Sequence, residues 1–413
     1  VVLPSESRPQ AGEFLTGAAA EISRTSGGHV RLVWSITENL GDWSIVRRRL
    51  FDELQRKQAT PAAGPGGEFF RASELPATAP DDAYFGQELG LRLRDASSVG
   101  WSPAAPATIV AGPGKHTWSL GTSTDPLTVA RHSAPSDDGL RPASRDTLAA
   151  RAAGRPIWGV LRGDVDNFGI RLRRAQTIEE HIQLSVVYKQ FFAGELEVLC
   201  SMPEFWRKVT ILYSGGNDFA VYGAWDALIP LAREVQRLFH RLGEENLKDF
   251  PGREGKTVTM ALSLAPAIDT PLSEVYEEAG AKLQVAKAAD KDCFSLLGRT
   301  LEWKQLGDAS ELKDELTRMI AEFGCEPHYL HDLCGLYRES QWTRRGRDAD
   351  SPAARPWRFH RRLNRILGPA RGREFQKARS ALVADLAGKN TANLKLRPSG
   401  RVALEWARLS AGE

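Results

Sequence analysis

Cysteine is scarce in this chain: four occur among 413 residues, and no two of them form a Cys-x-x-Cys pair. This count argues against a disulfide framework and is typical of a protein from a reducing cytoplasm. Apolar runs of about 18 residues or more are missing as well, so no membrane span is predicted. The chain starts at Val1 without a basic, apolar leader. We therefore expect a cytoplasmic protein with no membrane partner.

What is present is a globular composition with a basic C-terminal part. Hydrophobic residues make up 42% and charged residues 26%, and a length of 413 residues predicts two or three domains. The formal net charge is only +3, yet the segment Gly335–Glu413 contains 18 Lys and Arg against 7 Asp and Glu. Such a block indicates an anionic partner, RNA or DNA first, while a solvated helical face is the alternative.

The first predicted region, residues 1–150, alternates helix and strand signals. The apolar segment His29–Ile36 predicts a buried strand, and Trp43–Gln58 predicts an amphipathic helix. A loop rich in Pro, Ala and Gly over Thr60–Gly67 follows, and further loops with short strands complete the region.

The second region, residues 151–303, has the most regular pattern. A capping box at Thr177 and Glu180 predicts a helix start, and Thr270-Pro271 predicts another. Strands are predicted at Ile157–Gly163, Val209–Ser214, Phe219–Tyr222, Thr257–Leu264 and Phe294–Leu297. The order is β-α-β-β-α-β with an added α-β, which is an α/β (α+β) arrangement of the ferredoxin-like, split βαβ kind.

The third region, residues 304–413, is predicted to be helical and basic, with breaks near 347–356 and 368–372. Its aromatic and basic run from Trp357 to Arg362 suits either stacking on RNA or anchoring to a protein partner. Both interpretations remain open at this point.

Two acidic clusters in the second region indicate metal chemistry. Asp164 and Asp166 follow the first strand, and Asn217-Asp218 lies at the tip of a predicted hairpin. In a split βαβ sheet this strand and hairpin are neighbours, so the two clusters can meet. Phosphoryl and nucleotidyl transfer need such hard oxygen ligands to hold Mg²⁺ or Mn²⁺.

The hairpin glycines support the same interpretation. Gly215 and Gly216 allow a tight turn and the close approach of a triphosphate to the backbone. Taken alone, Gly-Gly-x-Asp is typical of any hairpin turn. The combination of DVDNFG, a capped helix, YSGGNDF and a later Ala286-Lys287, in this order, is much more specific. The neighbouring Tyr213 suits core packing or base stacking.

These motifs resemble the palm of GGDEF-type cyclases and, more closely, the second palm of the large subunit of type III CRISPR effector complexes. The resemblance implies synthesis of cyclic oligoadenylates from ATP when target RNA is bound. It implies Asp164 and Asp218 as catalytic residues, and Asp164, Asp166 and Asp218 as metal ligands. Cofactor and ATP contacts are then expected from Gly215, Gly216, Asn217, Lys287 and Lys291.

The resemblance extends more loosely to the rest of the chain. His29–Gln58 is similar to part of the first palm of the family, and Phe85–Ala96 to the segment that follows it. The sequences PWRFHRRLNRIL and RVALEWARLSAG resemble the C-terminal helical domain of the Csm-type subunit. The family relation implies guide RNA, target RNA and sister subunits as partners.

The chain departs from the family at the hairpin, where Asn217 replaces the first Asp of GGDD. An amide lacks the charge that holds Mg²⁺ tightly, so we expect a weakened synthase. A non-catalytic scaffold that binds RNA and sister subunits is the first alternative, and a fully active synthase is the second.

Two other family features are missing. There is no histidine in residues 1–28, so no N-terminal HD nuclease is expected and the chain resembles a reduced form that begins within the first palm. There is no CxxC zinc motif between the palms. The cluster of Cys325, His328, His331 and Cys334 would drift around a continuous helix, so no zinc site is expected.

Overall fold

The computed structural model describes residues 3–28, 30–59, 89–92, 96–101, 109–114, 116–119, 131–139, 141–345, 356–368, 372–387 and 398–412. Contacts divide the chain into two units. Unit 1 comprises Val1–Pro126 and Gly169–Val186, and unit 2 comprises Leu127–Phe168 and Val187–Glu413. The three-domain division inferred from the sequence stays a prediction.

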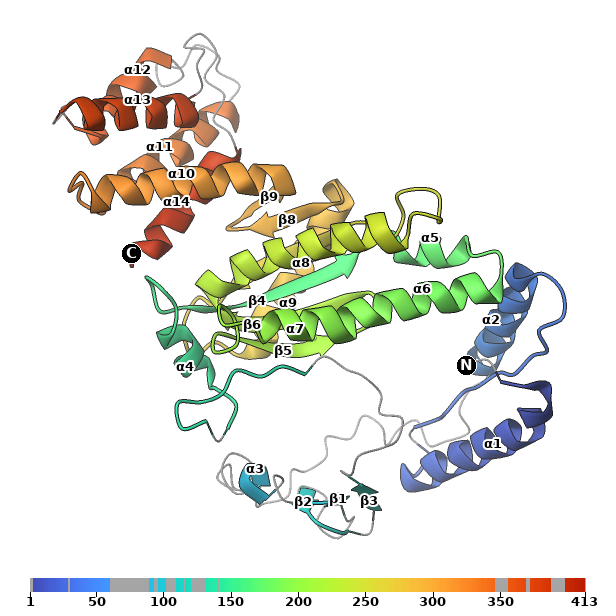
Figure 1. Cartoon of the computed structure of the whole chain (residues 1–413). Helices are drawn as coiled ribbons and strands as arrows, with labels where there is room; N and C mark the ends of the chain where they lie inside the picture. Colours follow the sequence, from blue (N-terminus) through green and yellow to red (C-terminus); the bar gives the residue numbers. More distant parts are fainter. Residues whose placement is uncertain are drawn as a thin grey trace. The chain divides into compact units, whose positions relative to one another are not determined.

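Unit 2 is built on a six-stranded sheet (Figure 1). Its strands are β4 (Trp158–Val165), β5 (Val209–Ser214), β6 (Asp218–Ala224), β7 (Val258–Leu264), β8 (Cys293–Leu296) and β9 (Arg299–Glu302). Their spatial order is β5-β6-β4-β7-β8-β9, with β7 and β8 parallel and all other neighbours antiparallel. Strand β4 lies between β6 and β7, as a split βαβ arrangement requires.

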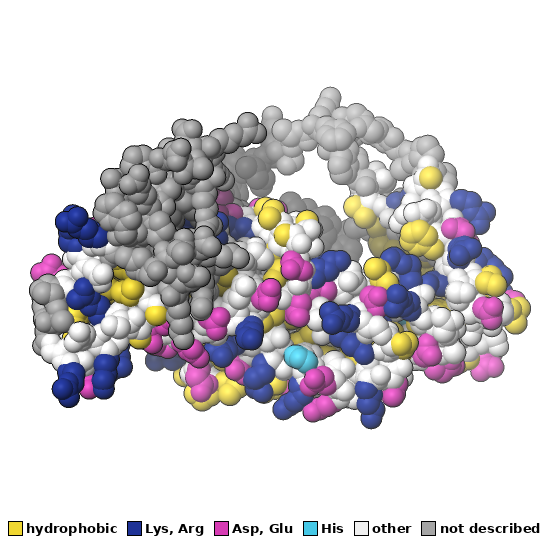
Figure 2. Space-filling view, turned by 90° about the horizontal axis from the view of Figure 1, so that it is seen from above, with side chains coloured by type: hydrophobic (Ala, Val, Ile, Leu, Met, Phe, Trp, Pro, Cys, Tyr) yellow, Lys and Arg dark blue, Asp and Glu magenta, His cyan; other side chains and the backbone are white. Residues whose placement is uncertain are grey.

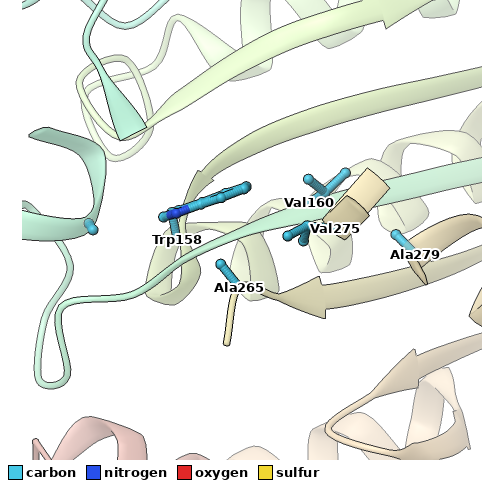
Figure 3. Close-up of a cluster of buried hydrophobic side chains, with 6 residues drawn as sticks. Trp158, Val160, Ala265, Val275 and Ala279 are labelled. Atoms are coloured by element: carbon cyan, nitrogen blue, oxygen red, sulfur yellow. The ribbon is translucent and has the colours of Figure 1, made fainter. Parts of the chain in front are cut away.

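Long helices cover this sheet. Within unit 2 they are a π-helical turn (Phe191–Glu195), which follows α6 (Ile178–Gln190) and continues into α7 (Leu196–Cys200), then α8 (Trp225–Asn246) and α9 (Leu272–Ala289). In β4, Val160 points toward Val275 and Ala279 of α9, in a buried apolar cluster that also contains Trp158 (Figure 3). On β6, Phe219 contacts Phe192 of the π-helical turn. The even-numbered residues of β4 therefore face α9.

Two helix starts differ from the predicted caps. Thr177 Oγ1 accepts the backbone N–H of Glu180, at 3.1 Å, but the Glu180 carboxylate accepts from the backbone of Gln176 instead of completing the box. Helix α9 has Pro271 at its N-cap position, while Thr270 Oγ1 accepts from the backbone N–H of Ala267. Both helices nevertheless begin within a residue or two of the predicted position.

The C-terminal part of unit 2 is helical, as predicted. Its helices are α10 (Trp303–Ala321), α11 (His328–Arg345), α12 (Pro356–Ile366), α13 (Arg373–Ala387) and α14 (Pro398–Ser410). Trp303, at the start of α10, stacks on Phe294 of β8, with ring centroids 5.4 Å apart. The predicted breaks at 347–356 and 368–372 lie mostly outside the described residues. The hairpin strand β9 was not predicted.

Unit 1 contains α1 (Arg8–Thr25), α2 (Trp43–Ala59), α3 (Leu89–Arg92), α5 (Phe168–Arg173, whose first residue belongs to unit 2) and the first turns of α6. A three-stranded sheet has the order β2 (Ile109–Ala111), β1 (Ser98–Trp101) and β3 (His116–Ser119). Helix α2 confirms the predicted amphipathic helix. The loop Thr60–Gly67 and most of Phe85–Ala96 lie outside the described residues.

The strand predicted at His29–Ile36 is wrong for residues 30–36, which have no regular structure; His29 is not among the described residues. The segment bonds to helix α2 instead of to another strand. Arg31 donates to the backbone oxygens of Lys57 and Gln58, and Lys57 Nζ donates to the oxygen of Trp34. A run of apolar residues predicts burial, but it becomes a strand only where a partner strand supplies hydrogen bonds.

Across the described residues, no helix has the length and apolarity needed to cross a membrane.

Candidate active site

The site begins with two carboxylates that the sheet places opposite each other. Asp164, near the end of β4, is the register partner of Asp218, the first residue of β6. Directly opposite residues of an antiparallel pair project from the same face, with Cβ atoms about 5 Å apart. The structure therefore brings together the two clusters that the sequence predicts to meet.

The β5–β6 hairpin fixes the position of Asp218. The backbone N–H of Gly215 donates to the carbonyl of Asp218 at 2.7 Å. A Cβ at Gly215 would lie 2.5 Å from Asp218 Oδ1, whereas one at Gly216 would meet no described atom within 4 Å. Tyr213 donates its hydroxyl to Asp218 Oδ2 at 3.0 Å. Gly215 is thus required for the carboxylate to occupy its position.

Tyr213, predicted either to pack in the core or to stack on a base, packs against another aromatic ring of the protein. Its side chain is half-buried, and its ring packs edge-on against Tyr276 of α9, with centroids 6.3 Å apart. Burial, together with hydrogen bonds to Tyr276 and Asp218, raises the pKa of Tyr213 well above its usual range. The phenol therefore stays protonated and acts as a donor to the carboxylate.

Asn217 bonds to the first carboxylate. Its side-chain Nδ2 donates to Asp164 Oδ1 at 2.9 Å, and its carbonyl accepts the backbone N–H of Val165 at 2.8 Å. The amide thus neutralises no charge but supplies a donor that an aspartate at this position would lack. An aspartate here would add a second negative charge next to Asp164.

Two lysines, one at the end of α9 and one in the turn after it, bring positive charge to the carboxylates at the end of β4. Lys287 Nζ lies 2.6 Å from Asp164 Oδ2 and 3.8 Å from Asp166 Oδ1, and it donates to the carbonyl of Val165 at 3.2 Å. Lys291 Nζ donates to Asn167 Oδ1 at 2.6 Å. Both lysines predicted from the sequence therefore lie at the end of β4.

Asp166 differs from the other two aspartates because it is only 1% exposed. Its Oδ1 accepts the hydroxyl of Thr259 at 2.7 Å, and its Oδ2 accepts the hydroxyl of Thr257 at 2.8 Å and the backbone N–H of Asp292 at 3.0 Å. Sequence reasoning missed these three donors. The alternation Thr257-Val258-Thr259 is the signal that two hydroxyls share one face of β7.

The four residues Cys325, His328, His331 and Cys334 are divided between the turn before α11 and the first half of that helix. Cys334 is buried, and the side chain of His328 is 73% exposed. The rings of His328 and His331 stack with centroids 5.5 Å apart. Within the part of the chain that the structure describes, no three His, Cys, Asp or Glu side chains are grouped as a metal site would require.

The region that contains this site has the sequence of a palm domain. Residues 157–295 match the family described as Cas10/Cmr2, second palm domain. Solved structures agree on the fold. A Csm1-Csm4 cassette without ligand superimposes with a TM-score of 0.66 over 99% of this chain and 60% of that chain, and one in complex with cA4 with a TM-score of 0.62. Sequence identity is 16% in both cases.

The curated relatives that the chain matches are Cas10/Csm1 proteins. The Cas10/Csm1 protein of Enterococcus italicus, a single-strand-specific deoxyribonuclease of a subtype III-A CRISPR system, is 28% identical over 163 residues. The Mycobacterium tuberculosis counterpart is 29% identical over 195 residues. The matched segments cover 38% and 42% of this chain but only 20% and 23% of those relatives. The chain is thus similar to Cas10/Csm1 proteins, and its residues 157–295 match the second palm domain of Cas10/Cmr2.

Proposed function

We propose that this chain acts as the palm-bearing large subunit of a type III-A CRISPR effector complex and binds ATP at the Asp164–Asp218 site. The observation that carries this proposal is the pairing of the two carboxylates across β4 and β6, with Lys287 beside Asp164. Paired carboxylates next to a cation suit a nucleoside triphosphate held through a divalent metal.

Asp164 and Asp218 fit a divalent cation. Both side chains are partly exposed, and Asp164 already pairs with an ammonium group at 2.6 Å. Mg²⁺ or Mn²⁺ would be held by these two carboxylates, and when bound it would neutralise charge on the phosphates. Asp166 was predicted as a third ligand. Since both of its oxygens are bonded inside the fold, we propose that it positions the end of β4 instead.

Lys287 and Lys291 would then bind phosphate oxygens. Lys287 is already at the acid pair, and Lys291 lies at the exposed rim next to Asn167. An ammonium is a compact point charge that serves this purpose well. Gly216, around which no described atom restricts the space, would let a phosphate approach the hairpin backbone.

The same geometry supports a weakened synthase. Asn217 offers an uncharged amide where the family has a carboxylate, and the amide is engaged as a donor to Asp164. Loss of a residue that only supports a metal ligand typically costs about 10–100-fold in affinity or activity, so loss of a ligand carboxylate should cost at least as much. Synthesis of cyclic oligoadenylates is therefore expected to be slow or absent.

Partners follow from the family and from charge. We propose that sister subunits assemble with this chain, as Csm4 does with Csm1 in the solved cassettes. We propose further that guide RNA and target RNA bind to the assembled complex. The exposed Arg361 and Arg365 of α12 are candidates for these contacts. On the face shown in Figure 2, Lys and Arg side chains are scattered among Asp and Glu instead of forming one large patch.

The test uses the complex assembled with its sister subunits, a guide RNA and a matching target. ATP conversion with Mn²⁺ is followed by chromatography for the wild type, Asn217→Asp and Asp218→Ala. We expect slow conversion by the wild type, an increase of at least about 10-fold for Asn217→Asp, and none for Asp218→Ala.

Other outcomes select the alternatives. Equal rates for the wild type and Asn217→Asp would show that the amide is tolerated and the synthase fully active. Failure of all three complexes to bind ATP, with RNA binding intact, would show a scaffold. Persistent conversion by Asp218→Ala would overturn the proposed site.

A further inference from the structure

Arg162 occupies a slot next to the acid pair that is shaped for its side chain. It precedes Asp164 by two residues on β4, so both side chains project from the face that α9 covers. Its register partners are Ala220 on β6 and Ala261 on β7. Because both side chains are small, they leave space beside Arg162 on this face of the sheet. Above it, a Cβ at Gly280 would lie 2.3 Å from Arg162 Nη1. A side chain at this position of α9 would therefore displace the guanidinium.

The guanidinium packs on an aromatic ring that belongs to a pair next to the site. The Arg162 guanidinium lies 4.0 Å from the ring centroid of Tyr276. Tyr276 packs edge-on against Tyr213, which donates its hydroxyl to Asp218. Arg162 is thus linked through two rings to the second carboxylate of the pair.

The donors of Arg162 are nevertheless largely unpaired within the described part of the chain. Its Nη1 reaches the carbonyl of Tyr276 only at 3.4 Å, and its buried Nε has no hydrogen-bond partner among the described residues. Buried polar groups are normally paired, and one that is not calls for an explanation. Arg145 provides a contrast: it stacks near Trp158, at 5.5 Å, but donates to the carbonyl of Thr270.

We propose that Arg162 is a phosphate-binding residue, whose ligand is a phosphate oxyanion of a nucleotide held at the Asp164–Asp218 site. This inference rests on the proposed function. The planar guanidinium presents paired donors that match a phosphate, and stacking on Tyr276 holds it in one orientation. Residues two apart on a strand are roughly 7 Å apart along the chain, so Arg162 would reach a phosphate next to the metal-bound one.

Two sources could supply that phosphate: the triphosphate of ATP or the internucleotide phosphate of a bound oligoadenylate. The test measures binding of ATP, of the dinucleotide ApA and of adenosine to the full chain with Mn²⁺ by equilibrium dialysis. Wild type, Arg162→Gln, Arg162→Lys and the matched control Arg145→Gln are compared. Circular dichroism melting verifies that each variant is folded.

Arg162→Gln is expected to weaken binding of ATP, of ApA or of both by about 10- to 100-fold, because charge-assisted hydrogen bonds are lost. Adenosine binding should not change, Arg162→Lys should recover part of the loss, and Arg145→Gln should match the wild type. A loss for ATP alone indicates the triphosphate, and a loss for ApA indicates the internucleotide phosphate.

The inference is overturned if Arg162→Gln binds ATP and ApA as the wild type does, or if adenosine binding falls equally. These results leave the proposed function standing, provided that Asp218→Ala still weakens ATP binding. A wild-type chain that binds no ATP at all overturns both.

Discussion

Asp166 shows what one buried carboxylate contributes to this site. Hydroxyls of Thr257 and Thr259 and the N–H of Asp292 fix it beneath the end of β4, where Asp164 projects. A buried charge is tolerated only when such partners satisfy it. The position of Asp164 therefore depends on donors from β7 and from the turn after α9.

Replacing Thr259 by Val keeps the shape of the fully buried side chain but removes a hydroxyl that donates to Asp166. We expect the free energy of unfolding to fall by about 1.5–3 kcal/mol, the usual effect of losing a hydrogen bond to a charged group. Urea denaturation measures it. Thr300→Val, at an exposed position of β9, is the matched control and should have little effect. Equal stability of the Thr259 variant and the wild type would show that Asp166 does not need this donor.

At the level of elements, the β5–β6 hairpin determines where the second carboxylate lies. Its two glycines differ sharply: a Cβ at Gly215 would press against the carboxylate of Asp218, while a Cβ at Gly216 would meet open space. A side chain would therefore collide with a neighbour at Gly215 but would have free space at Gly216.

This difference predicts opposite outcomes for two similar variants. Gly215→Ala must displace the Asp218 carboxylate and is expected to weaken Mn²⁺ binding by at least about 10-fold, as loss of support for a metal ligand does. Gly216→Ala should leave Mn²⁺ binding unchanged. Isothermal titration calorimetry on the full chain measures both. Identical Mn²⁺ affinities for the two variants would argue against Asp218 as a ligand.

The sequence predicts those elements whose signals are local. Alternation predicts β4 to β8, and start signals predict the beginnings of α6 and α9 to within a residue or two, because each of these elements carries its own pattern. The segment 30–36 was predicted wrongly because strand formation depends on a partner strand that local pattern does not reveal. The hairpin strand β9 is not predicted because it has only four residues, of which three are polar.

At the site, the sequence predicts the acid pair and the lysines through motif order. It could not show that Asn217 donates to Asp164 or that Arg162 Nε has no hydrogen-bond partner among the described residues, because both depend on side-chain packing between β4, β6 and α9. Local patterns therefore locate the chemistry, and tertiary contacts determine how each residue is used.

For the whole molecule, the Cas10-type palm of unit 2 is the part whose fold and homology are best defined. The matched segments cover only about a fifth of the two curated relatives. For this palm we propose that Asp164 and Asp218 bind ATP through a divalent metal.

Binding of ATP to the 413-residue chain in the presence of Mn²⁺ tests this proposal most directly. Equilibrium dialysis compares the wild type with Asp218→Ala. Saturable binding by the wild type, weakened by at least about 10-fold in Asp218→Ala, is the predicted result. Equal ATP affinity of the two proteins, or no ATP binding by the wild type, would contradict it.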